Sequence, residues 1–135
     1  QTLRQIEFAL FFFFIHSHTP ALNYEGILAT LNAVRDDIAI MQTPDYNRFA
    51  NGFSHIFAGG YAAGYYSYKW AEVLSADAFY MFIDSGNIFN KELGIKYKDT
   101  ILSQGGSYNM DKLFFNFAQR EPSVDSLLKI DGIIS

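Results

Sequence analysis

Residues 24–41 read YEGILATLNAVRDDIAIM, and this stretch indicates the fold class of the chain. Its apolar side chains recur at steps of four, three, four and three residues, at Ile27, Leu31, Val34, Ile38 and Met41. This spacing places them along one face of an α-helix, whereas a half-buried strand alternates at every second residue. The stretch therefore predicts a helix from Tyr24 to about Met41, closed by Thr43-Pro44.

The remaining chain adds further helices and contains no strand-like alternation of useful length. Helices are predicted over about 3–15, 62–83, 90–102, 110–118 and 124–129, with a loop and one short helical turn over 45–60. Asn90, Asn109 and Ser123 stand where a side-chain oxygen can cap a helix. In the 62–83 helix, one face is expected to carry Tyr65, Tyr68, Glu72 and Phe79. The prediction is an all-α fold of five to six helices, forming a single helical unit over 1–135.

The run ALFFFFI at 9–15 is apolar on all sides. It is much shorter than the roughly 18–20 residues that span a bilayer, so a buried helix is favoured over a strand or a membrane anchor. Because Thr2 to Ile15 already reads like the middle of a buried element, we also expect the chain to be part of a larger protein.

Composition bounds the class of protein. Half of the 135 residues are hydrophobic and 18% are aromatic, which indicates a folded domain rather than a disordered segment. The net charge is −4 and the charges are dispersed, which argues against a nucleic-acid-binding face. The absence of cysteine excludes disulfides and a thiolate zinc site. It fits a reducing compartment.

Residues 53–70, FSHIFAGGYAAGYYSYKW, form the most unusual stretch of the chain. Eight aromatic residues lie between Phe49 and Trp70, and glycines are interspersed among them at Gly59, Gly60 and Gly64. The polar rings are His55, Tyr61, Tyr65, Tyr66 and Tyr68. Two interpretations stay open at this point. The rings either form an aromatic core, or they present hydroxyl and imidazole groups to a bound amide or a developing oxyanion.

Other chemistry finds little support in the sequence. The histidines His16, His18 and His55 do not form a His-Glu-x-x-His zinc motif, and neither a Gly-x-Ser-x-Gly elbow nor a phosphate-binding loop is present. Gln104 to Ser107 is interpreted as a turn, and Arg120-Glu121-Pro122 as a helix end with a local ion pair. Glu72 is interpreted as a solvated or hydrogen-bonded residue rather than a general base.

Residues 53–70 closely resemble the substrate-binding segment of the thimet oligopeptidase and oligopeptidase A family of zinc metallopeptidases. The resemblance extends, in the same order, over essentially the whole chain. It includes LRQIEF at 3–8, EVLSADAF at 72–79, ILSQGGS at 101–107, REP at 120–122 and DSLL at 125–128. Phe57-Ala58 looks more like the oligopeptidase A branch than the dipeptidyl carboxypeptidase branch, and the choice between these activities stays open.

The resemblance implies a mostly helical enzyme with a deep channel for short peptides. One zinc would be held by a His-Glu-x-x-His helix that precedes the region matched here. By motif position, Tyr68 would hydrogen-bond the tetrahedral oxyanion, while Tyr61 and His55 would hold substrate backbone. The substrate-binding residues would also include Gly59, Gly60, Gly64 and Tyr65, the glycines keeping the loop mobile.

Three departures qualify the resemblance. The chain has no His-Glu-x-x-His, continues with phenylalanine at 11–14 where relatives often have an aspartate, and has Gln119 where a glycine usually precedes Arg-Glu-Pro. The interpretation is the carboxy-terminal substrate-binding part of a cytoplasmic zinc oligopeptidase. The isolated chain is expected to bind no zinc and to be inactive.

The expected partners are short peptides and the remainder of the peptidase chain, with no nucleic acid and no membrane. Surface that normally meets that remainder is expected to make the fragment a homo-oligomer. The alternative is a non-catalytic helical module that binds peptides or a partner, and a third possibility is a truncated remnant. A His-Glu-x-x-His encoded before Gln1 would favour the enzyme.

Overall fold

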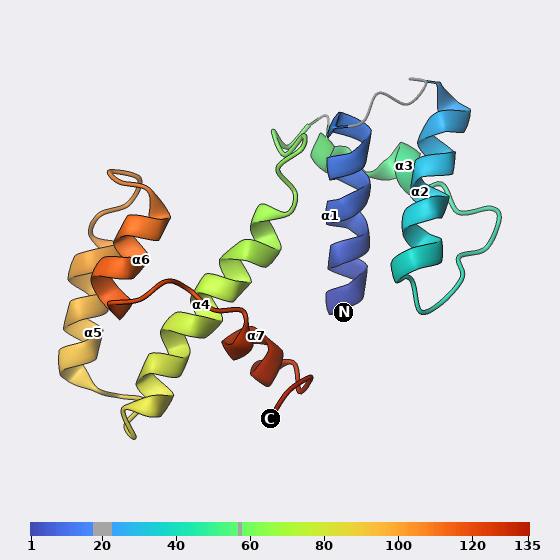
Figure 1. The fold of residues 1–135 in the computed structure, drawn as a ribbon. Coiled ribbons are helices and arrows are strands. Elements are labelled where there is room, and N and C mark those ends of the chain that lie inside the picture. The colour runs from blue at the N-terminus through green and yellow to red at the C-terminus, as the bar shows by residue number, and fades with distance from the viewer. Residues whose placement is uncertain (18–22, 57) are drawn as a thin grey trace. The chain divides into compact units, whose positions relative to one another are not determined.

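A computed structural model describes residues 1–17, 23–56 and 58–135. The chain divides into two compact units, Gln1–Lys69 and Trp70–Ser135, and each is described by itself (Figure 1). Every regular element in the described ranges is helical, so the predicted all-α fold is confirmed. None of these helices combines the length and apolar character needed to cross a membrane. The single helical unit over 1–135 stays a prediction.

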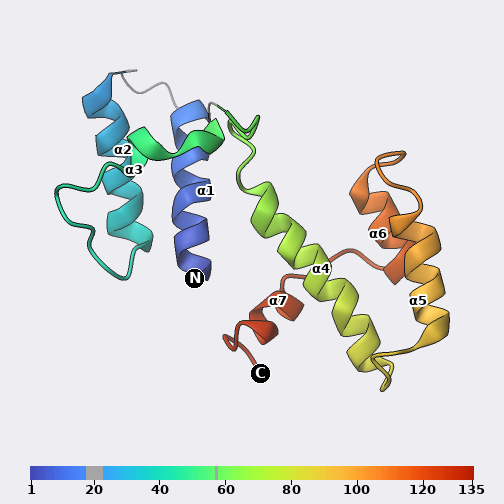
Figure 2. The same ribbon diagram turned by 180° about the vertical axis from the view of Figure 1, so that it is seen from behind.

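The first unit is built on α1 (Thr2–Ser17) and α2 (Tyr24–Ile38), which run side by side in Figures 1 and 2. In α1, Phe8, Phe11 and Phe12 are buried, as their spacing of three and four residues along a helix requires. Phe13, on another side of the helix, leaves 48% of its surface in water. The predicted buried helix is therefore confirmed, but only one face of its apolar run is covered.

Helix α2 begins where the sequence predicts and ends about one turn early. Asn23 caps its start by accepting a hydrogen bond from the Gly26 amide at 2.8 Å. At its end, Ala39 turns to extended backbone. Ile40 and Met41 are 83% and 80% exposed, so an added turn would gain no apolar burial. The predicted continuation to Met41 is wrong.

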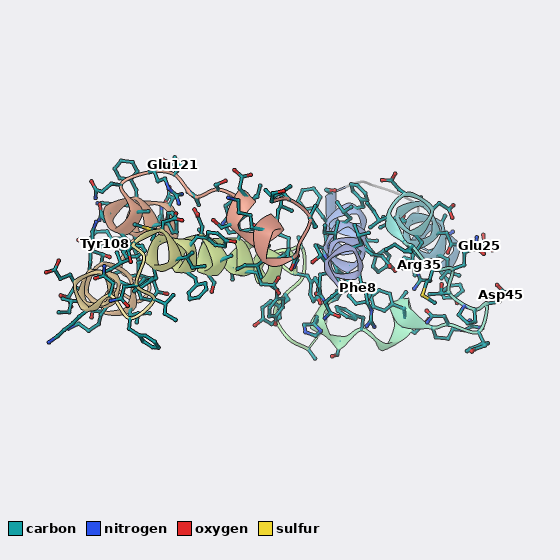
Figure 3. All side chains as sticks on the ribbon, turned by 90° about the horizontal axis from the view of Figure 1, so that it is seen from below. Phe8, Glu25, Arg35, Asp45, Tyr108 and Glu121 are labelled. Atoms are coloured by element: carbon teal, nitrogen blue, oxygen red, sulfur yellow. The ribbon has the colours of Figure 1, made fainter. Side chains whose placement is uncertain are left out.

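Two short turns close the first unit within the predicted loop, α3 (Phe49–Gly52) and the 3₁₀ turn η1 (Ser54–Ile56). The Phe49 ring stacks on Phe8 of α1 with centroids 4.3 Å apart, and the Arg35 guanidinium of α2 lies 5.8 Å from its centroid. Arg35 also pairs with the buried Glu7 at 2.9 Å. Figure 3 labels Phe8 and Arg35, which hold the turn between the two helices.

Helix α4 (Ser67–Asp84) begins five residues later than the predicted residue 62. Residues 62–66 form turns instead, and the amides of Ser67, Tyr68 and Lys69 donate to carbonyls only three residues back, at 3.0–3.3 Å. Tyr65 therefore precedes the helix and does not share a helical face with Tyr68, Glu72 and Phe79, contrary to the prediction. Tyr65 is buried and Phe79 is 48% exposed.

The second unit packs α5 (Lys91–Tyr97), its π-helical continuation η2 (Lys98–Leu102) and α6 (Met110–Ala118) against α4. Figures 1 and 2 both show α5 beside α6. Their shared core is formed by Phe114, Phe117 and Ala78. Asn90 caps α5 by accepting from the Leu93 amide at 3.1 Å, as predicted.

A buried carboxylate, Asp77 of α4, anchors the last helix, α7 (Asp125–Ile130). Asp77 is 1% exposed and accepts two hydrogen bonds from Arg120, at 2.6 and 2.7 Å. It also accepts from the Ser123 amide and the Ser126 hydroxyl, both at 2.8 Å. The prediction of a local ion pair at Arg120 is therefore wrong, because its partner lies 43 residues away in sequence.

Candidate functional site

The first unit brings together four of the five polar rings that the sequence analysis identified, and Tyr66 is the one left out. Tyr61 and Tyr68 have ring centroids 5.0 Å apart, and Tyr65 lies 5.3 Å from Tyr68. The His55 ring is 5.3 Å from Tyr65, 5.8 Å from Tyr61 and 6.0 Å from Tyr68. These four residues are called the His55–Tyr68 cluster below.

Tyr65 forms the base of the His55–Tyr68 cluster. Its ring is 8% exposed and contacts Phe12 of α1 and Phe53, at centroid distances of 5.5 and 5.2 Å. Its hydroxyl donates a hydrogen bond to Oε1 of Gln5 at 2.8 Å. Burial raises the pKa of Tyr65, and the positive charge of Arg4 opposes this shift. Tyr65 thus joins the cluster to the core of the first unit.

His55 is half-buried in η1 and is held by rings on several sides. It stacks on Phe53 at 4.7 Å with an angle of 25° between the planes, and it meets Tyr65 and Tyr68 edge to face. Such ring contacts fix the plane of the imidazole, whose nitrogens can donate or accept hydrogen bonds.

Tyr61 and Tyr68 carry the exposed edge of the cluster. Their side chains are 36% and 41% exposed, whereas Tyr65 below them is covered. Tyr68 lies in the first turn of α4. The Tyr68 hydroxyl donates a hydrogen bond to the Tyr61 oxygen, which raises the pKa of Tyr68, and desolvation and the neighbouring phenols act in the same direction. Tyr68 is therefore a protonated hydrogen-bond donor at neutral pH.

The glycines of the loop differ in backbone conformation and in the space around them. Gly60 has φ of +69°, a conformation that glycine adopts without strain. Gly59 has no such φ but lies directly against the Tyr61 ring, and a Cβ on it would come within 2.9 Å of Tyr61 Cδ2. Gly64 has room for an ordinary side-chain contact. The Tyr61 amide donates to the His55 carbonyl at 3.2 Å, which closes the loop.

The other residues considered in the sequence lie outside the cluster or carry no comparable arrangement. Tyr66 and Glu72 are exposed, and Nδ1 of His16 lies 2.7 Å from the Phe12 carbonyl at the end of α1, as a helix-end residue would. His18 is outside the described residues.

Over residues 1–17, 23–56 and 58–135, no group of three or more histidine, cysteine, aspartate or glutamate side chains is placed to hold a metal ion. These residues therefore do not fit the zinc that the family resemblance implies.

Sequence reasoning missed two residues that shape the cluster. Gln5 orients the Tyr65 hydroxyl from 60 residues away, and Phe53 supplies the face on which His55 stacks. Nothing in the sequence signals the Gln5 contact, because it depends on how α1 meets the turn before α4. The role of Phe53 could have been inferred from the run of aromatic residues that begins at Phe49.

Comparison with known proteins places this chain in a family. The family model described as peptidase family M3 matches residues 1–133. Oligopeptidase A of Escherichia coli strain K12 is 50% identical over 131 residues, which are 97% of this chain and 19% of that protein. The oligopeptidase A of Haemophilus influenzae is 49% identical over 133 residues, 98% of this chain and 19% of that protein.

Similarity also reaches plant and carboxypeptidase relatives. A probable cytosolic oligopeptidase A of Arabidopsis thaliana is 44% identical over 137 residues, covering 99% of this chain and 20% of that protein. A dipeptidyl carboxypeptidase of Escherichia coli is 36% identical over 81 residues, 60% of this chain and 12% of that protein. The chain thus spans about a fifth of the length of its oligopeptidase A relatives. With the family model matching nearly every residue, this chain belongs to peptidase family M3.

Proposed function

We propose that this chain is the substrate-binding and oxyanion-stabilising part of a zinc metallo-oligopeptidase that hydrolyses short peptides. The observation that carries the proposal is the pair of exposed, mutually contacting phenols, Tyr61 and Tyr68, held on the buried base of Tyr65. Membership of peptidase family M3 supports the reaction class.

In this proposal Tyr68 is the oxyanion donor. Attack on a peptide carbonyl places negative charge on its oxygen, and a preorganised donor aimed at that oxygen stabilises the transition state by about 3 kcal/mol. A phenol suits the role if it keeps its proton, and the raised pKa of Tyr68 supports this. Its position in the first turn of α4 limits the reorganisation needed when charge develops.

Tyr61 and His55 are proposed to bind the substrate backbone on either side of the scissile bond. Both are donors and acceptors, and both contact Tyr68 through their rings. The family resemblance places Tyr65 among the substrate-binding residues, but its buried hydroxyl already donates to Gln5. We therefore assign Tyr65 a positioning role beneath the other three rings.

The metal and the remaining walls of the site are proposed to come from the rest of the peptidase chain. Two observations support this: the described residues offer no metal-ligand group, and the chain spans about a fifth of its relatives. When bound, zinc would supply Lewis-acid chemistry to the reaction. A cytoplasmic location is part of the proposal, supported by the relative named as a cytosolic oligopeptidase A.

The test is Tyr68→Phe in the full-length peptidase. We expect kcat to fall roughly a hundredfold or more while KM changes little, because the lost hydroxyl acts mainly in the transition state. Tyr46→Phe is the matched control, since Tyr46 is 81% exposed in the same unit and outside the cluster. An unaltered kcat in Tyr68→Phe would remove Tyr68 from the mechanism.

The isolated chain tests the assignment of the metal to other residues, and the full-length protein tests the alternative of a non-catalytic module. Incubated with zinc and a quenched fluorescent peptide, the 135-residue chain is expected to give no sustained turnover. Turnover would contradict the assignment of the metal to other residues. A full-length protein that binds peptides but never cleaves them would favour the module.

A further inference from the structure

Gly59 is the tightest point of the loop that carries Tyr61. A Cβ built on Gly59 would lie 2.9 Å from Cδ2 and 3.4 Å from Cε2 of the Tyr61 ring, and 3.5 Å from the His55 Cα. The first of these distances is shorter than carbon atoms in contact allow, since their optimum is about 3.5–4.0 Å. The edge of the Tyr61 ring therefore occupies the space that a side chain at residue 59 would need.

The requirement at Gly59 is for space and not for an unusual backbone conformation. Among the described residues, the glycines with positive φ are Gly60, Gly86, Gly105 and Gly132. Gly60 has open space around its missing Cβ, whereas Gly59 has ordinary φ and no space. The two adjacent glycines thus serve different purposes, which the expectation of a uniformly mobile loop does not distinguish.

We propose that Gly59 is a positioning residue for the peptide site: its missing side chain seats the Tyr61 ring and thereby sets the Tyr61 hydroxyl beside Tyr68. We call this contact between the Tyr61 ring and the Gly59 backbone the seat. Its role in catalysis rests on the proposed function, whereas the contact itself rests only on the geometry of the loop. The ring is enclosed by the Gly59 backbone, the Tyr68 ring at 5.0 Å and the His55 ring at 5.8 Å.

A side chain at residue 59 must displace the ring or the loop. The Tyr61 ring is the easier of the two to move, because its side chain is 36% exposed and can rotate toward water. The buried ring of Tyr65 is not expected to move, because its hydroxyl is bonded to Gln5. Gly59→Ala is therefore expected to leave the fold intact and to separate the Tyr61 and Tyr68 hydroxyls.

The test measures the ionisation of Tyr68 in the full chain, by NMR of tyrosine labelled with ¹³C at Cζ. The titratable groups facing Tyr68 are His55, Tyr61 and Tyr65, and the hydrogen bond that Tyr68 donates to Tyr61 contributes most to its raised pKa. Gly59→Ala and Tyr61→Phe are both expected to lower the pKa of Tyr68 toward its ordinary value. The double variant is expected to lower it no further than Tyr61→Phe alone.

Gly64→Ala is the matched control. It makes the same Gly-to-Ala change in the same loop, at ordinary φ and with its nearest atoms at 3.7 and 4.0 Å. Its Tyr68 pKa is expected to equal that of the unmodified chain, and far-UV circular dichroism checks that both variants fold. A Tyr68 pKa unchanged by Gly59→Ala, or changed equally by Gly64→Ala, would overturn the proposal.

Measuring kcat/KM of the full-length peptidase then distinguishes a failure of the Gly59 positioning from a failure of the proposed function. If both hold, Gly59→Ala lowers kcat/KM by up to about a hundredfold, as a displacement of about 1 Å in a catalytic site can. If the Tyr68 pKa falls while kcat/KM stays constant, the seat exists and the catalytic role of the phenol pair is wrong.

Discussion

Replacing Asp77 by Asn tests how the second unit holds its last helix. Each carboxylate oxygen of Asp77 accepts two hydrogen bonds: Oδ1 from Arg120 Nη2 and the Ser126 hydroxyl, and Oδ2 from Arg120 Nη1 and the Ser123 amide. Asn keeps the shape but retains one oxygen, so two bonds to a charged group are lost. At about 1.5 kcal/mol each, the free energy of unfolding should fall by about 3 kcal/mol.

The assay is urea unfolding at neutral pH, followed by circular dichroism and by the fluorescence of Trp70, the only tryptophan in the sequence. Asp99→Asn is the matched control. Asp99 pairs with Lys98 at 3.0 Å, but both side chains are more than half exposed, so the loss should stay below about 1 kcal/mol. Equal small losses in the two variants would refute the reasoning that the buried carboxylate anchors α7.

The effect of Asp77→Asn on the free energy of unfolding is expected to depend on pH. Burial raises the pKa of Asp77, but the hydrogen bonds from Arg120, the Ser123 amide and Ser126 outweigh it, so the folded-state pKa lies below the ordinary value. The resulting stability is present above the ordinary carboxyl pKa and is lost as the pH falls through the folded value. The difference in unfolding free energy between wild type and Asp77→Asn should therefore shrink in acid. A difference that stays constant down to the lowest pH of the titration would contradict this.

Three further outcomes are expected. Tyr65→Phe should destabilise the first unit by about 1 kcal/mol in chemical denaturation, because it leaves the glutamine oxygen of α1 without its buried donor; no change would show that water replaces the hydroxyl. Phe117→Ala should cost about 3–5 kcal/mol because Phe117 is fully buried, whereas Phe115→Ala, 46% exposed in the same helix, should cost far less; similar losses would contradict the assigned core. The isolated chain should scatter light as a dimer or larger species, since Ile40 and Phe89 leave 83% and 85% of their surface in water; a monomer mass would count against this.

Local sequence signals predicted which segments are helical. They did not predict the helix ends that depend on contacts with other elements. The capping residue Asn90 and the regular apolar stripe of α2 act within one element, so both could be read from the sequence. The start of α4 could not. Residues 62–66 are compatible with a helix by composition, but burial of Tyr65 against α1 and its bond to Gln5 favour turns there.

The candidate site shows the same division. The membership of the cluster followed from the density of rings in residues 53–70, and the structure places His55, Tyr61, Tyr65 and Tyr68 in contact. The difference in burial between Tyr65 and its neighbours could not be predicted, because all are tyrosines in one short segment. The pairing of Asp77 with Arg120 was equally hidden, since a separation of 43 residues carries no periodic signal.

The tyrosines of the cluster differ in burial, and this difference separates a structural base from an exposed edge. Four rings in one segment could form an apolar plug, but Tyr65 is the buried ring of the four, through its contact with Phe12 and its bond to Gln5. With the base fixed, Tyr61 and Tyr68 remain exposed, and the ring of one faces the ring of the other. Hydrogen-bond donors that are both exposed and fixed in direction are what a peptide backbone requires for binding. In the proposed function, the packed base is therefore what holds the exposed phenols in place for a bound peptide.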